Sequence, residues 1–141
     1  PIFVKLKTQT MKKAILIDVH NRTITEVNVL EDKSGSQLSS IYEHLKCSIF
    51  ECVNIGKNDI YVDEEGILDV TPDTKFFFYK GTHQPFAGNG LIMGFDDETG
   101  DSVDTTLTID QVKSNVKFMT ATEVALSVRM GVLGPLYTFP E

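Results

Sequence analysis

Residues 81–90 form the segment whose residue types are best suited to bind a ligand. Glycines allow the backbone to approach a ligand closely, and successive backbone N–H groups can surround an anion. The G-x-x-x-x-G-K-[ST] sequence of a phosphate-binding loop is absent, so a tight turn leading into a strand is the alternative interpretation. The candidate ligand-binding residues are His83, Gln84, Phe86, Gly88 and Asn89.

The two arginines, Arg22 and Arg129, are further candidates for binding an anion. A guanidinium group binds phosphate or carboxylate through paired hydrogen bonds. Because the chain has no other arginine, such a site would use one or both of them, with help from Lys75 or Lys80.

An acidic turn follows the glycine-rich segment. If Asp97 is the first position of a calcium-binding EF-hand loop, Ser102 stands where glycine is needed and Thr108 where the final glutamate is needed. The sequence therefore predicts an exposed hairpin turn bent at Gly100. The alternative is an acidic decoy that imitates DNA phosphates. The acidic surface residues are Asp96, Asp97, Glu98 and Asp101.

The sequence contains no recognisable catalytic or metal-binding pattern. Cys47 and Cys52 have no second cysteine pair, so they predict two reduced, mostly buried thiols rather than a zinc site. The three histidines lack H-x-x-x-H spacing, and no G-x-S-x-G sequence is present. The acidic residues between 59 and 65 are expected at a hairpin tip exposed to solvent. We therefore expect a protein that is not an enzyme and carries no cofactor or metal.

Length and composition fit one globular domain. The chain has 141 residues, 41% hydrophobic and 23% charged, and its 20 acidic and 13 basic residues give a net charge of −7. No apolar run approaches the roughly 18 residues of a membrane span, and no signal peptide is recognisable. An acidic chain without a basic run is a poor partner for nucleic acid or an anionic membrane, so a cytoplasmic protein is expected.

The chain is predicted to begin with a hairpin. Apolar runs at 14–19 and 23–30 flank a turn in which Asn21 takes the left-handed conformation. The broken alternation at Glu26 allows a β-bulge. A second hairpin is expected to turn at 64–66, and the aromatic run 76–79 is predicted to be a buried strand. The remaining strands are expected at 49–55, 59–63, 67–70, 91–95, 103–107 and 116–119.

Helices are predicted from their caps. Ser36 is expected to begin a helix with one apolar face and with His44 on the surface. Capping boxes at Thr108–Gln111 and Thr120–Glu123 predict two more helices. Alternating apolar residues leave a strand as the alternative for the last of them, but we favour the helix. The helices are expected at 36–46, 109–115 and 121–130.

Strands joined by short turns, with two or three short helices between them, are typical of the α+β class. We expect a single compact domain at 11–131 with a mixed or antiparallel sheet. Residues 1–10 are interpreted as a leader or an extra strand, and 132–141 as an extended C-terminal tail.

Residues 11–119 resemble a family of small proteins of unknown function found in phages and other mobile elements. The resemblance rests on the apolar run 14–18 with 21–27 after it, on the segment 61–66, and on 84–94 with the acidic turn that follows. Residues 120–135 also resemble a short helical stretch of podovirus portal proteins. These resemblances imply an accessory role in a mobile element and no particular activity.

We therefore expect a non-enzymatic accessory protein that binds a host protein or a small ligand, and not nucleic acid or a membrane directly. A homodimer is favoured, because short exposed strands and the apolar tail need cover. One alternative is a small enzyme acting on a nucleotide or peptide at residues 81–90, with His83 as acid or base. The other is the acidic decoy of a DNA-binding protein.

Overall fold

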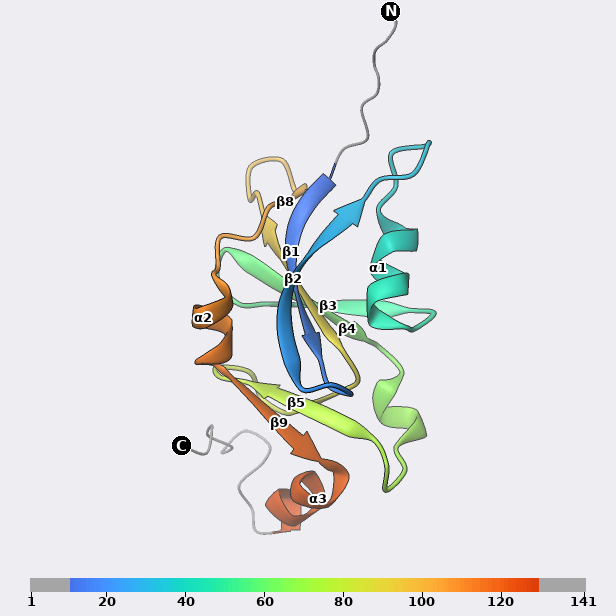
Figure 1. Cartoon of the computed structure of the whole chain (residues 1–141), viewed down its shortest axis with the longest axis vertical. Coiled ribbons are helices and arrows are strands. Elements are labelled where there is room, and N and C mark those ends of the chain that lie inside the picture. Colours follow the sequence, from blue (N-terminus) through green and yellow to red (C-terminus); the bar gives the residue numbers. More distant parts are fainter. Residues whose placement is uncertain (1–10, 130–141) are drawn as a thin grey trace, which may run out of the picture.

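Two antiparallel sheets, with helices packed on them, make up most of the structure (Figure 1). The computed structural model describes residues 11–129, without the side chain of Arg129. The larger sheet has the strand order β2-β1-β7-β4-β3, with β8 paired to β7, and the smaller sheet has the order β6-β5-β9. The strands are β1 (Met11–Asp18), β2 (Thr23–Leu30), β3 (Phe50–Asn54), β4 (Asn58–Asp63), β5 (Lys75–Tyr79), β6 (Phe86–Ala87), β7 (Gly90–Phe95), β8 (Ser102–Val103) and β9 (Val116–Thr120). The helices are α1 (Leu38–Leu45), α2 (Ile109–Lys113), α3 (Ala121–Arg129) and the 3₁₀ helix η2 (Gly66–Asp69).

The predicted fold class is confirmed, because the strands and helices form one compact α+β domain. Every strand pairing between residues 11 and 129 is antiparallel, which settles the choice between a mixed and an antiparallel sheet. None of the helices in this part of the chain is long and apolar enough to span a membrane.

Both predicted capping boxes form. The Thr108 hydroxyl accepts from the Gln111 backbone N–H at 3.1 Å, and the Gln111 side chain accepts from the Thr108 N–H at 2.8 Å. Thr120 and Glu123 make the same exchange at 3.1 and 2.8 Å. Because these bonds occupy N–H groups that a helix leaves free at its start, α3 forms and the strand alternative is wrong.

The β1–β2 hairpin has no bulge, and that prediction is wrong. Pairing runs without a break from Met11 opposite Leu30 to Asp18 opposite Thr23. The alternation breaks because both faces of the sheet are covered: Ile24 packs into the core between the sheets, whereas Val29 packs on the opposite face under α1.

The turn of this hairpin also differs from the prediction. Arg22, and not Asn21, has the left-handed conformation, with φ 54°. The Asp18 carboxylate accepts hydrogen bonds from the backbone N–H of His20 and of Asn21 and from the Asn21 side chain, and these bonds fix the start of the turn.

The hydrophobic core has three parts. Side chains from both sheets meet in the first, which includes the fully buried Ile60, Phe77 and Ile92. The second part of the core lies under α1. The third part lies under α3 and contains Phe76 and Phe78. The aromatic run 76–79 is therefore a buried strand, as predicted.

Two predicted strands are wrong because tertiary contacts redirect the chain. Residues 67–69 belong to the 3₁₀ helix η2, and Val70 follows it; Gly66, at the start of η2, lies so close to Ala87 that an added Cβ would be 2.7 Å from the Ala87 carbonyl oxygen. The return strand at 103–107 stops at Val103, because Asp104 and Thr105 bond instead to the backbone of Lys13.

The α1 helix begins and ends close to the predicted residues. Its N-cap is Gln37 rather than Ser36, although the Ser36 hydroxyl accepts from the Leu38 N–H at 3.2 Å. The helix ends at Leu45, and Lys46 has the left-handed conformation usual after a helix end.

Candidate functional site

The segment 81–90 supports the fold rather than enclosing a cavity. Asn89, only 4% exposed, accepts from the Val19 N–H at 3.0 Å and donates to the His44 carbonyl at 3.2 Å. Phe86 packs on Phe77 with ring centroids 5.4 Å apart. Gly88 has φ 93°, and its N–H donates to the Lys75 carbonyl at 3.0 Å. Gly88 thus forms a bend that leads from β6 into β7, close to the predicted turn, and ligand binding by this segment stays a prediction.

His83 and Gln84 are exposed, and they line none of the hollows described below. Arg22 lines one of these hollows, so the structure does not place His83 and Gln84 in the same hollow as Arg22. Arg129 is the last residue of α3, and its side chain lies outside the described part of the structure.

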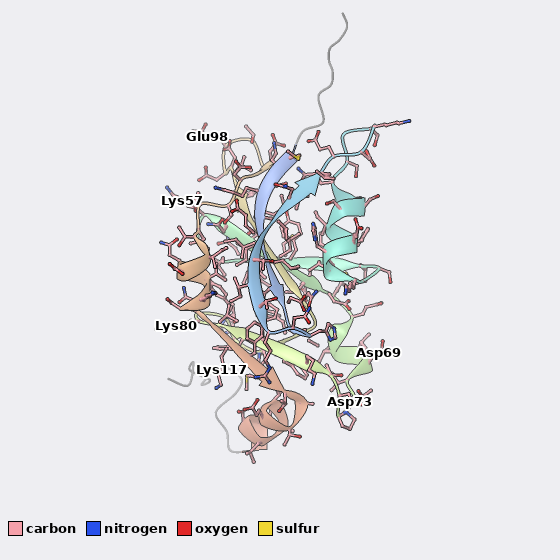
Figure 2. All side chains as sticks on the ribbon, in the orientation of Figure 1. Lys57, Asp69, Asp73, Lys80, Glu98 and Lys117 are labelled. Carbon is pink, nitrogen blue, oxygen red and sulfur yellow. The ribbon has the colours of Figure 1, made fainter. Side chains whose placement is uncertain are left out.

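The acidic turn is the predicted exposed hairpin between β7 and β8. Asp96 accepts from the backbone N–H groups of Glu98 and Gly100 and donates its own N–H to the Asp101 carbonyl. Asp97 and Glu98 are exposed, and Glu98 lies at one extreme of the molecule (Figure 2). Within residues 11–129, no group of three His, Cys, Asp or Glu side chains is placed to hold a metal ion.

The cysteines are free, but the prediction that both are mostly buried is wrong for Cys52. Cys47 is half-buried and Cys52 is exposed on β3, at an edge of the larger sheet. Partial burial nevertheless raises the pKa of both thiols, and nearby carboxylates raise it further. Burial also raises the pKa of the neighbouring Tyr61 to about 12. Because the thiolate is the reactive form of cysteine, a raised pKa lowers the fraction of each thiol that can react at neutral pH.

A cationic hollow lies where the β1–β2 hairpin, α2 and β9 meet. Its volume is about 390 Å³, within the range of small-ligand pockets. Two cations border it, two threonines of β2 lie on one side, and three apolar residues complete the lining. The lining residues are Arg22, Thr23, Ile24, Thr25, Lys113, Val116 and Phe118.

Local structure places the two cations. Arg22 ends the turn that Asp18 organises, and its positive φ is a conformation that asparagine or glycine adopts more easily. Lys113 is the last residue of α2, which is positioned by the Thr108 capping box and by Val112, a fully buried residue of the first core.

The charges of the hollow are not neutralised by close contacts. Neither Arg22 nor Lys113 has an ion-pair partner within 4.0 Å among the described residues. The pKa of Glu123 is lowered, first by the hydrogen bond from the Thr120 N–H and also by the positive charges of Lys117 and Arg22, so this carboxylate interacts with Arg22 from beyond ion-pair distance.

The adjacent hollow differs from the cationic hollow in the pairing of its cation. It has a volume of about 270 Å³ and lies between the β1–β2 hairpin and the start of α2. Its lysine, Lys13, lies 3.9 Å from the Glu26 carboxylate. The cation of the adjacent hollow is therefore paired. Of these two hollows, the cationic hollow is the one that combines unpaired positive charge with an apolar lining.

Charge is distributed unevenly over the molecule. Lys80 and Lys117 lie on the side where α2 meets β9, whereas Asp69 and Asp73 lie near η2 at the other end of β5 (Figure 2). A third hollow, of about 500 Å³, is bordered by both Lys57 and the acidic turn and so has mixed charge.

Sequence reasoning found Arg22 but not the residues that complete its site. Lys113, and not Lys75 or Lys80, lines the hollow with it. Phe118 was predicted only as part of a strand. The capping box that places α2 was visible, but nothing in the sequence indicates that the end of this helix faces the first hairpin.

A family model described as a domain of unknown function, DUF3846, matches residues 11–117. The chain therefore belongs to this family, and the expected resemblance to a family of unknown function is confirmed over this range. No curated protein and no solved structure matches the chain significantly.

Proposed function

We propose that this DUF3846 protein acts by binding an anionic partner in the cationic hollow, rather than by catalysis. The observation that carries the proposal is the pair of cations, Arg22 and Lys113, which lack ion-pair partners in the described residues and border an apolar lining. In a chain with a net charge of −7, leaving two cations unpaired around one hollow favours an external anion as their partner.

The lining indicates the chemistry of the partner. The guanidinium and ammonium groups suit a phosphate or carboxylate. Phe118 and Val116 offer contact to an apolar or aromatic group. The biological setting that we propose is an accessory protein of a phage or mobile element, whose partner is a host protein or a small anionic ligand.

A titration with phenyl phosphate tests this proposal, because the compound combines an anion with an aromatic ring. We expect the largest changes in the backbone amide NMR signals at Thr23, Thr25 and Phe118. Arg22→Asn should weaken binding about tenfold or more, because a charge-assisted hydrogen bond is lost. Asparagine also tolerates the positive φ of this position.

The control for this experiment is Lys33→Gln, which removes one positive charge from an exposed loop position. It should leave the affinity unchanged. The proposal is wrong if phenyl phosphate causes no localised change, or if both variants weaken binding equally, since equal losses would indicate only an effect of net charge.

A further inference from the structure

One half of the open edge of β2 is closed by α1. Among residues 11–129, β2 is the last strand of the larger sheet, so its outward backbone groups have no strand partner within this range. The Leu30 N–H donates to the Ser40 hydroxyl at 3.1 Å, and His44 Nε2 lies 2.9 Å from the Asn28 carbonyl oxygen. Because a carbonyl only accepts, this nitrogen carries a proton. His44 is thus half-buried and bonded, contrary to its predicted surface position.

These bonds fix which residues of β2 point outward. In an antiparallel ladder, residues alternate between facing the partner strand and facing away from it. The backbone groups of Leu30 and Asn28 point away from β1. Lys13, which lies opposite Asn28, confirms this orientation, because its N–H and carbonyl bond to Asp104 and Thr105 instead of to β2. With unbroken register, the N–H and C=O of Ile24 and Glu26 also point outward.

The edge strand of the smaller sheet is open at the same place. The Lys80 N–H donates to the Asn115 carbonyl at 2.9 Å, so the backbone of Asn115 faces the β5 side. Because alternate residues face opposite sides, the backbone groups of Val116 and Phe118 point away from β5. Ile24, Val116 and Phe118 all line the cationic hollow. Two open strand edges therefore border the hollow that holds Arg22 and Lys113.

We infer that the partner in the cationic hollow is an extended acidic peptide segment, which adds to the edge of β2 as a new strand. The inference rests on the proposed function and names the partner. Its backbone pairs with Ile24 and Glu26, and one of its carboxylates binds Arg22 and Lys113. An open strand edge is a ready template for such an addition, with main-chain bonds giving affinity and side-chain pockets giving specificity.

Charge selects an acidic segment over a basic one. The side chain of Glu26, at the far end of this stretch, is already paired with Lys13 at 3.9 Å. Among the described residues, the charges that border the hollow without an ion-pair partner are those of Arg22 and Lys113, and Glu123 acts on Arg22 only from beyond 4.0 Å. A small anion would satisfy these cations but would leave the outward N–H and C=O groups of β2 bonded only to water.

The test begins with selection from a surface-displayed library of short random peptides on the full chain. We expect the enriched peptides to contain Asp or Glu among β-branched or aromatic residues. When the best of them binds, hydrogen exchange at the Ile24 and Glu26 amides should slow by about tenfold or more, since both become ladder bonds. Phenyl phosphate should not slow these two amides.

N-methylation of the selected peptide provides the decisive control. One version of the peptide carries methyl groups on the alternate backbone nitrogens that face β2. It should not bind, because these nitrogens can no longer donate hydrogen bonds to β2. A second version, methylated on the nitrogens that face away from β2, should still bind. Arg22→Asn should lower the affinity for the peptide about tenfold or more, and Lys33→Gln should leave this affinity unchanged.

Enrichment of neutral or basic peptides, or tolerance of N-methylation in both phases, would overturn strand addition. If phenyl phosphate binds but no peptide is enriched, the proposed function survives and the strand addition fails. If neither binds, both are wrong.

Discussion

Replacing Asn89 by alanine separates its structural role from the ligand-binding role that the sequence suggested. The side chain joins two elements: its oxygen accepts from the Val19 N–H just after β1, and its amide donates to the His44 carbonyl in the last turn of α1. The second bond satisfies one of the carbonyl groups that a helix leaves free at its end.

The expected cost follows from burial. Val19 is 1% exposed and Asn89 is 4% exposed, so no water replaces the lost acceptor easily. An unsatisfied buried N–H costs about 1–3 kcal/mol, and the net loss of the bond to His44 adds about 1 kcal/mol. Asn89→Ala should therefore lower the free energy of unfolding by about 2–4 kcal/mol, a large part of the ~5–15 kcal/mol typical of a domain.

Urea unfolding followed by circular dichroism measures this change. Asn28→Ala is the matched control, because the Asn28 side chain is exposed on β2, and it should change the free energy of unfolding by less than about 0.5 kcal/mol. In Asn89→Asp, a carboxylate oxygen would face the His44 carbonyl oxygen. Burial and this repulsion would raise the pKa of the new carboxyl, so the variant should gain stability as the pH falls.

The reasoning is refuted if Asn89→Ala unfolds at the same urea concentration as the wild type. If that variant kept its stability and lost phenyl phosphate binding, Asn89 would be a ligand-binding residue and the cationic hollow would be the wrong site.

Three further predictions concern packing and helix capping. Gly90→Ala should cost about 1–3 kcal/mol, measured by thermal unfolding, because the new Cβ would lie 2.5 Å from Phe77 Cζ in the core. Thr120→Ala should destabilise the protein by about 1 kcal/mol. Glu123→Gln should keep the capping box but remove the titratable carboxyl group. The pKa of Glu123 is lowered by the hydrogen bond from the Thr120 N–H. The stabilisation by Glu123 is therefore present above the ordinary carboxyl pKa and is lost as the pH falls through the lowered pKa. The stability difference between the wild type and Glu123→Gln should therefore shrink on acidification, as denaturant unfolding at neutral and acidic pH would show.

Features that depend on neighbours in the sequence could be predicted. The capping boxes at Thr108 and Thr120 need only a residue three positions later, and both form. The buried strand at 76–79 follows from its run of aromatic residues. These interactions have the same partners whatever the rest of the chain does.

Features that depend on distant partners could not be predicted. The alternation at Glu26 reads as a bulge until it is known that α1 covers one face of β2 and the smaller sheet the other. Gly66, the first residue of η2, lies against the Ala87 backbone, a partner distant in the sequence. For the same reason Arg22 was a visible candidate, whereas Lys113 becomes its neighbour only through the packing of α2 against β2.

The cations of the hollow have a second physical explanation, which one variant can test. Proteins often place charges at open strand edges to prevent pairing between molecules. If Arg22 serves only this purpose, Arg22→Asn should cause self-association through β2, visible as a larger sedimentation coefficient that rises with concentration.

If Arg22 binds an anionic partner, the same variant should sediment as the wild type does and lose affinity for the acidic peptide. Its unfolding temperature should be unchanged or slightly higher, because asparagine fits the positive φ of this position better than arginine. Self-association together with unchanged affinity would show that the charge protects the edge and that the partner binds elsewhere.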